Sequence, residues 1–97
     1  MAQYDVYWLD EQHVLDCQSD FVDAFNSRLV VPLLPLADAP PAVKRLMPAF
    51  EVEGEKLVMA TPLASAVLHG RLGRPVASLK KHADEISAAL DFLITGF

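Results

Sequence analysis

The spacing of the apolar residues changes once along the chain, near Leu79, and this change limits the folds that the chain can adopt. Before Leu79, apolar and polar side chains alternate in short runs, a pattern typical of half-buried strands. From Leu79 onward, apolar residues recur at helical spacing, which indicates an amphipathic helix. The residues on its apolar side are Leu79, Ala83, Ile86, Leu90, Leu93 or Ile94, and Phe97. We therefore expect a mainly β fold, a sheet or small barrel, capped by a C-terminal α-helix.

Between Tyr4 and Gly73 the sequence predicts five or more short strands. Two hairpins are expected, one turning through the polar residues 10–13 and the other at Gly54. Pro32 lies inside another predicted strand, and because proline cannot donate a hydrogen bond to a neighbouring strand, we expect it at a sheet edge or a bulge. The predicted segments are 4–9, 14–18, 28–34, the hairpin 48–61 and 65–73.

Three single residues also have expected positions. Ser78 precedes the helix, which should cover roughly 15 residues, and its hydroxyl makes it a suitable N-cap. Trp8 lies in an aromatic-rich strand and is expected in the core. Cys17 is the only cysteine, and we expect it to behave as a small buried hydrophobic side chain rather than as a reactive thiol.

The chain is richer in apolar residues than a small domain needs. It has 97 residues, of which 53% are hydrophobic, and we expect residues 1–97 to form a single domain. Because a domain of this size buries only part of its surface, the excess indicates that some apolar surface contacts another chain. The C-terminal stretch ALDFLITGF (Ala89 to Phe97) carries much of this excess.

Charge and cysteine content disfavour several classes of protein. Eight lysines and arginines against 13 aspartates and glutamates give a net charge of −5, which argues against direct nucleic-acid binding, because phosphate contacts need a basic surface. We expect neither a membrane span nor a secretion signal. A single cysteine allows no intrachain disulfide, and a cytoplasmic location is expected.

The sequence does not predict an enzyme or a metal site. His13, His69 and His82 are scattered, and Cys17 has no second cysteine near it, so no metal-ligand spacing is present. Serine, histidine and aspartate all occur, but their presence alone says almost nothing about a catalytic triad. No cofactor and no catalytic residue are therefore expected. An unrelated small enzyme is the competing class, and it would need a substrate cleft.

Five short blocks, in order along nearly the whole chain, resemble the CcdB toxins of bacterial toxin–antitoxin modules. The blocks are DCQSD (Asp16 to Asp20), RLVVPL (Arg28 to Leu33), MPAFEV (Met47 to Val52), MATPLASAV (Met59 to Val67) and ISAALDFLITGF (Ile86 to Phe97). Each block alone is a weak signal, whereas five in register are specific. The resemblance implies an SH3-like small barrel with a short accessory sheet and a C-terminal helix, which forms a symmetric homodimer.

The resemblance also implies a function without catalysis by the protein itself. It implies binding to the A subunit of DNA gyrase, which holds gyrase covalently joined to cleaved DNA, and displacement by the disordered C-terminal arm of a cognate antitoxin. The implied gyrase-binding residues are Ser19, Phe21, Val22, Asp91, Ile94, Thr95, Gly96 and Phe97. Because the chain is acidic, a basic or mixed-charge antitoxin arm is its natural complement. Candidates for that contact are Asp10, Glu11, Asp20 and Asp23.

The C-terminus departs from the best-known family pattern. That pattern ends in Trp-Gly-Ile, whereas this chain ends in Thr95, Gly96 and Phe97. A large aromatic side chain can anchor an interface, so the alternative function is a binding module that keeps the antitoxin but has lost gyrase poisoning. For Phe97 itself, the alternatives are a partner contact and packing into the core of its own chain.

Overall fold

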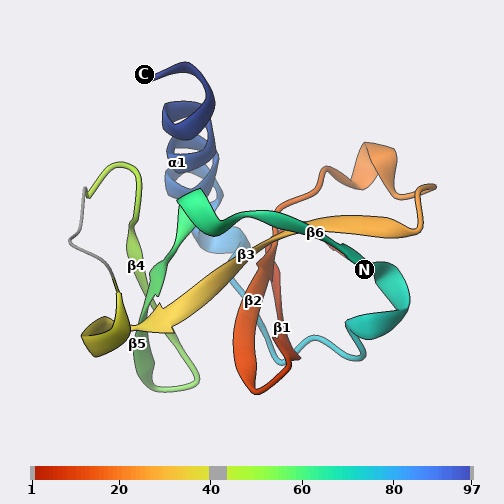
Figure 1. Ribbon diagram of the computed structural model, residues 1–97, viewed down its shortest axis with the longest axis horizontal. Helices are drawn as coiled ribbons and strands as arrows, with labels where there is room; N and C mark the ends of the chain where they lie inside the picture. The colour runs from red at the N-terminus through yellow and green to blue at the C-terminus, as the bar shows by residue number, and fades with distance from the viewer. Residues whose placement is uncertain (1, 40–43, 97) are drawn as a thin grey trace.

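The computed structural model describes residues 2–39 and 44–96 and confirms a mainly β fold with a C-terminal helix (Figure 1). Within these residues the strands form one sheet, and short 3-10 turns join several of them. The strands are β1 (Asp5–Leu9), β2 (Gln12–Asp16), β3 (Ser27–Pro35), β4 (Ala49–Val52), β5 (Glu55–Met59), β6 (Ser65–Leu68) and β7 (Ala77–Ser78). The 3-10 turns are η1 (Asp20–Val22), η2 (Leu36–Asp38), η3 (Thr61–Leu63), η4 (His69–Arg71) and η5 (Lys80–His82). The helix is α1 (Ala83–Thr95).

Strand β3 is the centre of the sheet. On one side, residues 30–33 of β3 pair with β2. On the other side, residues 27–30 pair with β6 and residues 33–35 pair with β5. With β1 and β7 beyond β2, these strands make a nearly closed, barrel-like sheet. The β4–β5 hairpin forms the accessory part of the sheet, and β3 makes it continuous with the barrel (Figure 1).

Pro32 does not lie on an edge strand, so the edge prediction is wrong. It pairs with Val14 of β2, and on its other side its carbonyl accepts a hydrogen bond from the Ala60 N–H at 2.9 Å. The backbone N and O atoms of a strand residue point to the same neighbour, so the missing N–H of Pro32 faces the junction between β5 and β6. A proline is tolerated in this central strand because β3 changes its pairing partner there, from β6 to β5, so no strand hydrogen bond needs the missing N–H.

The two predicted hairpins form, and the first has a tighter turn than predicted. Asp10 and Glu11 alone make this turn, with φ angles of 50° and 65°, while residues 12–13 belong to β2. Two consecutive residues at positive φ give a turn whose twist matches that of the paired strands. The second hairpin turns at Glu53 and Gly54, which also have positive φ.

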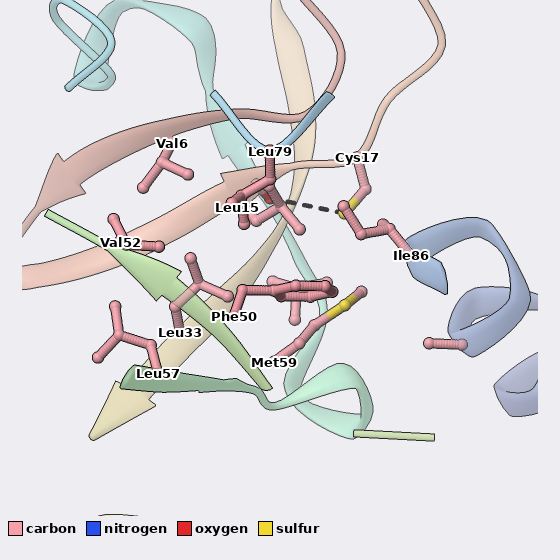
Figure 2. Close-up of a cluster of buried hydrophobic side chains, with 12 residues drawn as sticks. Val6, Leu15, Cys17, Leu33, Phe50, Val52, Leu57, Met59, Leu79 and Ile86 are labelled. Carbon is pink, nitrogen blue, oxygen red and sulfur yellow. Dashed lines mark hydrogen bonds between the residues drawn. The ribbon is translucent and has the colours of Figure 1, made fainter. Parts of the chain in front are cut away.

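The main hydrophobic core lies between the barrel and α1 (Figure 2). Leu15 comes from the barrel and Phe50 from the accessory hairpin, while α1 contributes Ile86 and Ala89. Leu79, just before the helix, is buried in the same cluster. The predicted apolar side of the helix is thus confirmed at Ile86 and Leu90, which pack on the core, and is wrong further along, where Leu93 and Ile94 are exposed.

Of the two side chains predicted in the core, only Cys17 is buried there. Burial raises the pKa of its thiol to about 12, so the thiolate that reactive cysteines need is absent near neutral pH. Trp8 is 53% exposed, and its predicted core position is wrong. It shares a face of β1 with Val6 but lies nearer the hairpin turn, where its ring meets the His13 ring nearly at right angles, with 4.6 Å between centroids.

The C-terminal helix begins later than predicted. The Ser78 Oγ accepts a hydrogen bond from the N–H of Lys80, the first residue of η5, at 3.3 Å, whereas the N-cap position of α1 is His82, so Ser78 does not cap α1. The helix proper has 13 residues and begins at Ala83. It ends at Gly96, whose φ of 81° is the left-handed conformation common after a last helical turn.

The Tyr7 hydroxyl generates the first prediction. Tyr7 is fully buried in a second apolar cluster with Val14 and Val30, and its hydroxyl has no hydrogen-bond partner among the described residues. Because an unpaired buried hydroxyl is costly, Tyr7→Phe should raise the free energy of unfolding by about 1 kcal/mol in urea denaturation. The half-buried Tyr4 provides the control variant Tyr4→Phe, which should change it less. A loss of stability in Tyr7→Phe would contradict the absence of a partner.

Candidate functional site

The first group of implied site residues lies on η1, between β2 and β3. Ser19 caps this turn, since its Oγ accepts a hydrogen bond from the Phe21 N–H at 3.2 Å. No residue of η1 is buried: Phe21 is 99% exposed, and Val22 is exposed as well. Phe25, a little further along, is also exposed. Segment 21–25 therefore presents three large apolar side chains to solvent, a feature that commonly marks an interaction site.

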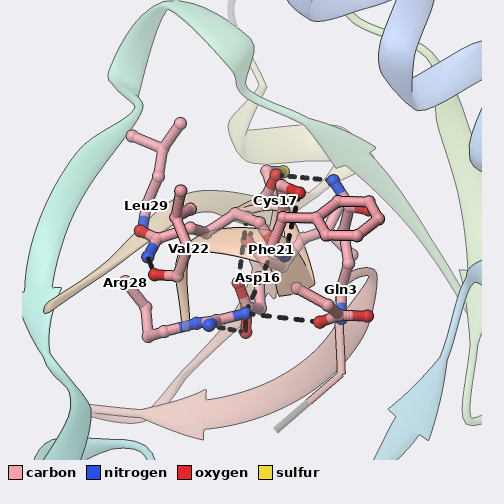
Figure 3. Close-up of polar contacts among 11 residues, drawn as sticks. Gln3, Asp16, Cys17, Phe21, Val22, Arg28 and Leu29 are labelled. Carbon is pink, nitrogen blue, oxygen red and sulfur yellow. Dashed lines mark hydrogen bonds and ion pairs between the residues drawn. The ribbon is translucent and has the colours of Figure 1, made fainter. Parts of the chain in front are cut away.

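A buried ion pair supports this segment from below (Figure 3). The Nε and Nη2 atoms of Arg28 lie 2.9 and 2.8 Å from the Oδ2 atom of Asp16, and both side chains are buried. Burial raises the pKa of the Asp16 carboxyl, and the hydrogen bonds from Arg28 and from the Gln18 N–H oppose that shift. Arg28 Nη2 also donates to the Gln18 carbonyl at 3.2 Å. The pair thus holds the backbone that leads into η1.

Two glutamines complete the support, Gln18 through its side chain and Gln3 through its backbone. The Gln18 side chain donates to the Val22 carbonyl at 2.9 Å and accepts a hydrogen bond from the backbone of β3 at 3.0 Å. Gln3 donates its backbone N–H to the Asp20 carboxylate at 2.9 Å. The backbone of η1 is therefore fixed even though its apolar side chains are exposed. A surface that is ordered before binding loses less entropy when a partner arrives.

The second group lies at the end of α1. Ile94 is 78% exposed, and Asp91, one turn earlier, is also exposed. The Thr95 Oγ1 donates a hydrogen bond to the Asp91 carbonyl at 2.7 Å, so this hydroxyl is bonded within its own helix. Gly96 ends the helix, and Phe97, for which partner contact and core packing were the alternatives, lies outside the described residues.

The structure brings the residues of each group together, but it does not join the two groups within one chain. No hydrogen bond or ion pair within residues 2–39 and 44–96 links η1 to the end of α1. In Figure 1, η1 lies at the upper right and the end of α1 at the top left.

Tyr4 packs on the core beside α1. Burial raises the pKa of its hydroxyl, and the nearby negative charge of Asp91 raises it further.

The sequence analysis missed Phe25 and the buried pair of Asp16 and Arg28. A signal for the pair was present, because Arg28 and Val30 are two positions apart on one strand and therefore share its inward face. An arginine at an inward position needs a buried carboxylate to neutralise it. Phe25 lies in segment 21–25, where the apolar residues do not alternate as in a strand and the run is too short to show a helical period, so no pattern predicted its position.

The described residues offer no alternative site of a metal-dependent kind. Within 2–39 and 44–96, no three His, Cys, Asp or Glu side chains are grouped so that they could hold a metal ion. In the same part of the chain, no helix has the length and apolar character needed to cross a bilayer. The candidate site consists of the exposed apolar side chains on η1 and, separately, at the end of α1.

Replacing one member of the buried pair should cost much more stability than replacing both. Arg28→Met leaves the Asp16 carboxylate buried without its partner, and we expect a loss of about 3–5 kcal/mol in the free energy of unfolding. The double variant Asp16→Val/Arg28→Met removes both charges, and its unfolding free energy should return to within about 2 kcal/mol of the starting protein. Urea denaturation measures both values, and strictly additive losses would contradict the pairing.

The double variant also tests whether the pair organises η1. Because it lacks the bond from Arg28 to the Gln18 carbonyl, chymotrypsin should cleave next to Phe21 or Phe25 faster than in the starting protein. Unchanged cleavage would show that η1 is ordered without the pair.

The comparison with known families agrees with this arrangement of barrel, exposed turn and terminal helix. The sequence matches the family model described as CcdB protein over residues 3–96, nearly the whole chain. A search among curated proteins found no match. The matched range includes η1, the buried pair beneath it and all of α1. The chain therefore belongs to the CcdB family of toxin–antitoxin toxins.

Proposed function

We propose that this protein is the toxin of a type II toxin–antitoxin module, which binds the A subunit of DNA gyrase and traps the complex with cleaved DNA. The proposal rests on one observation: both groups of residues that the family resemblance assigns to gyrase binding have exposed apolar side chains. Phe21 is 99% exposed on η1 and Ile94 is 78% exposed on α1, and a few such anchors commonly dominate the affinity of an interface. The proposed gyrase-binding residues are Ser19, Phe21, Val22, Asp91, Ile94, Thr95, Gly96 and Phe97.

The proposed functional form is a symmetric homodimer. A two-fold axis duplicates every surface patch, so a dimer would offer gyrase two copies of η1 and two ends of α1. In such a dimer, η1 of one chain and the end of α1 of the other could together make one continuous surface. Further exposed apolar side chains, among them Leu63 and Leu68, are available for the contact between protomers.

The second proposed partner is the cognate antitoxin. Its disordered C-terminal arm would fold along the toxin and displace it from gyrase, at an ordering cost of several kcal/mol. We place this exchange in the cytoplasm. The net charge of −5 supports a toxin that meets DNA only through gyrase. In this mechanism the damage to the cell comes from gyrase held on cleaved DNA, so the toxin needs no catalytic residue of its own.

One observation favours the alternative, a binding module that keeps the antitoxin but does not poison gyrase. Thr95 stands where the best-known family pattern has tryptophan, and its hydroxyl is bonded to the Asp91 carbonyl of its own helix. The side chain therefore offers neither a large apolar area nor a free donor to a partner. This alternative predicts antitoxin binding without growth arrest.

Removal of Thr95, Gly96 and Phe97 tests the proposed function. Expression of the full chain in a sensitive bacterium should arrest growth, and the purified protein should trap cleaved DNA with gyrase. The chain ending at Ile94 should do neither, because part of the proposed contact is missing. It should still fold, since the buried helix residues Ile86 and Ala89 are retained. If the full chain is harmless although it forms dimers and binds the antitoxin, the alternative function is correct.

Replacement of Phe21 tests the contribution of η1 separately. Phe21→Ser removes a fully exposed aromatic ring, so it should leave folding intact and weaken gyrase binding by about 2 kcal/mol, or roughly thirtyfold. Leu36→Ser is the matched control, because Leu36 is also an exposed apolar residue but lies on η2. Titration of the gyrase A subunit with each variant measures the affinities. Equal weakening by both substitutions would contradict a role for η1.

A further inference from the structure

A hollow lies on the outer face of the β4–β5 hairpin, between η2 and α1. It has two adjoining parts of about 340 and 230 Å³, which share Lys44, Pro48 and Glu85. The other described lining residues are Leu36, Met47, Ala49, Lys56 and Val58 in the larger part, and Arg45 and Ala88 in the smaller part. We name this the basic hollow. None of its described lining residues is among the proposed gyrase-binding residues.

The floor of the basic hollow is apolar. Ala49 and Val58 are paired across the hairpin, so both lie on the face opposite to that of Phe50, which belongs to the main core. Met47 and Val58 are buried but belong to neither hydrophobic core cluster. Leu36, which also lines the hollow, is 61% exposed. The hollow therefore has an apolar floor of its own, separate from the core beneath the helix.

The charges around this floor are mostly positive, although the chain has a net charge of −5. Lys44, Arg45 and Lys56 line the hollow, and no ion pair within residues 2–39 and 44–96 involves any of them. Among the described lining residues Glu85 is the one carboxylate, and it lies 3.5 Å from the His82 Nδ1 atom. Cations grouped beside an apolar wall create a local positive potential, which attracts an anion.

The chemistry of the lining favours a small amphiphile over a polypeptide. Apart from its four charged residues, the described lining is apolar and includes no hydroxyl and no carboxamide side chain. A peptide backbone buried there would leave N–H and C=O groups without partners, which is costly, whereas an alkyl chain has no such groups. A concave, mostly apolar site with a few charged groups is typical of small-molecule binding.

We propose that the basic hollow binds a medium-chain alkyl carboxylate. The carboxylate pairs with Lys44 and Lys56, the two cations of the larger part. The alkyl chain covers Met47, Val58 and Leu36, and its apolar surface is thereby removed from water. This site is separate from the proposed gyrase contact, and its occupation does not depend on gyrase poisoning.

Isothermal titration calorimetry of the intact protein with sodium octanoate, below its micelle concentration, tests the proposal. We expect octanoate to bind. Butanoate keeps the charge but has a short chain, and octan-1-ol keeps the chain but has no charge, so each should bind more weakly. Methyl NMR spectra locate the ligand: the Met47 methyl signal should shift, whereas that of Met59, which lies in the main core, should not.

Two pairs of substitutions separate the hollow from the overall charge. Lys44→Gln/Lys56→Gln should weaken octanoate binding about fivefold, as expected for the loss of two solvent-exposed ion-pair partners. Lys80→Gln/Lys81→Gln removes the same number of charges from exposed residues that line neither part of the hollow, and it should leave the affinity unchanged. Circular dichroism confirms that each variant is folded.

Four results would overturn the proposal. Equal weakening by both pairs of substitutions would show attraction to net charge alone, and an unshifted Met47 signal would place octanoate elsewhere. Equal affinity for octanoate and octan-1-ol would remove the role of the cations. Displacement of octanoate by an equal concentration of a peptide with a Glu-Leu-Glu centre would make a polypeptide the preferred occupant. The experiment contains neither gyrase nor antitoxin, so its failure would leave the proposed function intact.

Discussion

The organisation of this protein depends on the buried ion pair between Asp16 and Arg28. It joins the last residue of β2 to β3 and, through the Gln18 carbonyl, to the backbone that leads into η1. Burying two charges is expensive, and a well-packed apolar pair would often be as stable. What the charges supply here is donors and acceptors that hold a loop in place. The exposure of Phe21 is consequently a property of a fixed turn, not a sign of a loose one.

Strand β3 sets the second constraint, because it belongs to the barrel and to the accessory hairpin at once. Its partner changes from β6 to β5 near Pro32, where the missing N–H leaves no bond unmade. One strand shared by both parts of the sheet also makes their cores continuous, so Phe50 of the hairpin lies in one cluster with Leu15 of the barrel. The helix α1 then covers a single core rather than two.

Periodicity predicted the fold class well because alternation and helical spacing each follow from local geometry. It failed where the outcome depends on distant residues. The spacing of residues shows that Trp8 shares a face of β1 with the buried Val6. It does not show that the core covers Val6 but leaves Trp8, nearer the hairpin turn, exposed. Similarly, the residues within η1 and within α1 are neighbours in sequence and could be grouped in advance. Their relation to each other depends on the whole fold, as does the pairing of Arg28 with Asp16.

Under the proposed function, threonine at position 95, where the best-known family pattern has tryptophan, changes which residues would anchor the symmetric complex. In a two-fold dimer each substitution acts twice, so a missing anchor weakens both halves of a contact. At the end of α1, Thr95 is bonded to its own helix and Ile94 supplies the exposed apolar area. The largest exposed aromatic surface among the described residues belongs instead to segment 21–25, at Phe21 on η1 and Phe25 just after it. Under the proposed function, binding strength therefore shifts from the helix end to a turn whose backbone is already held by Asp16, Arg28 and Gln18.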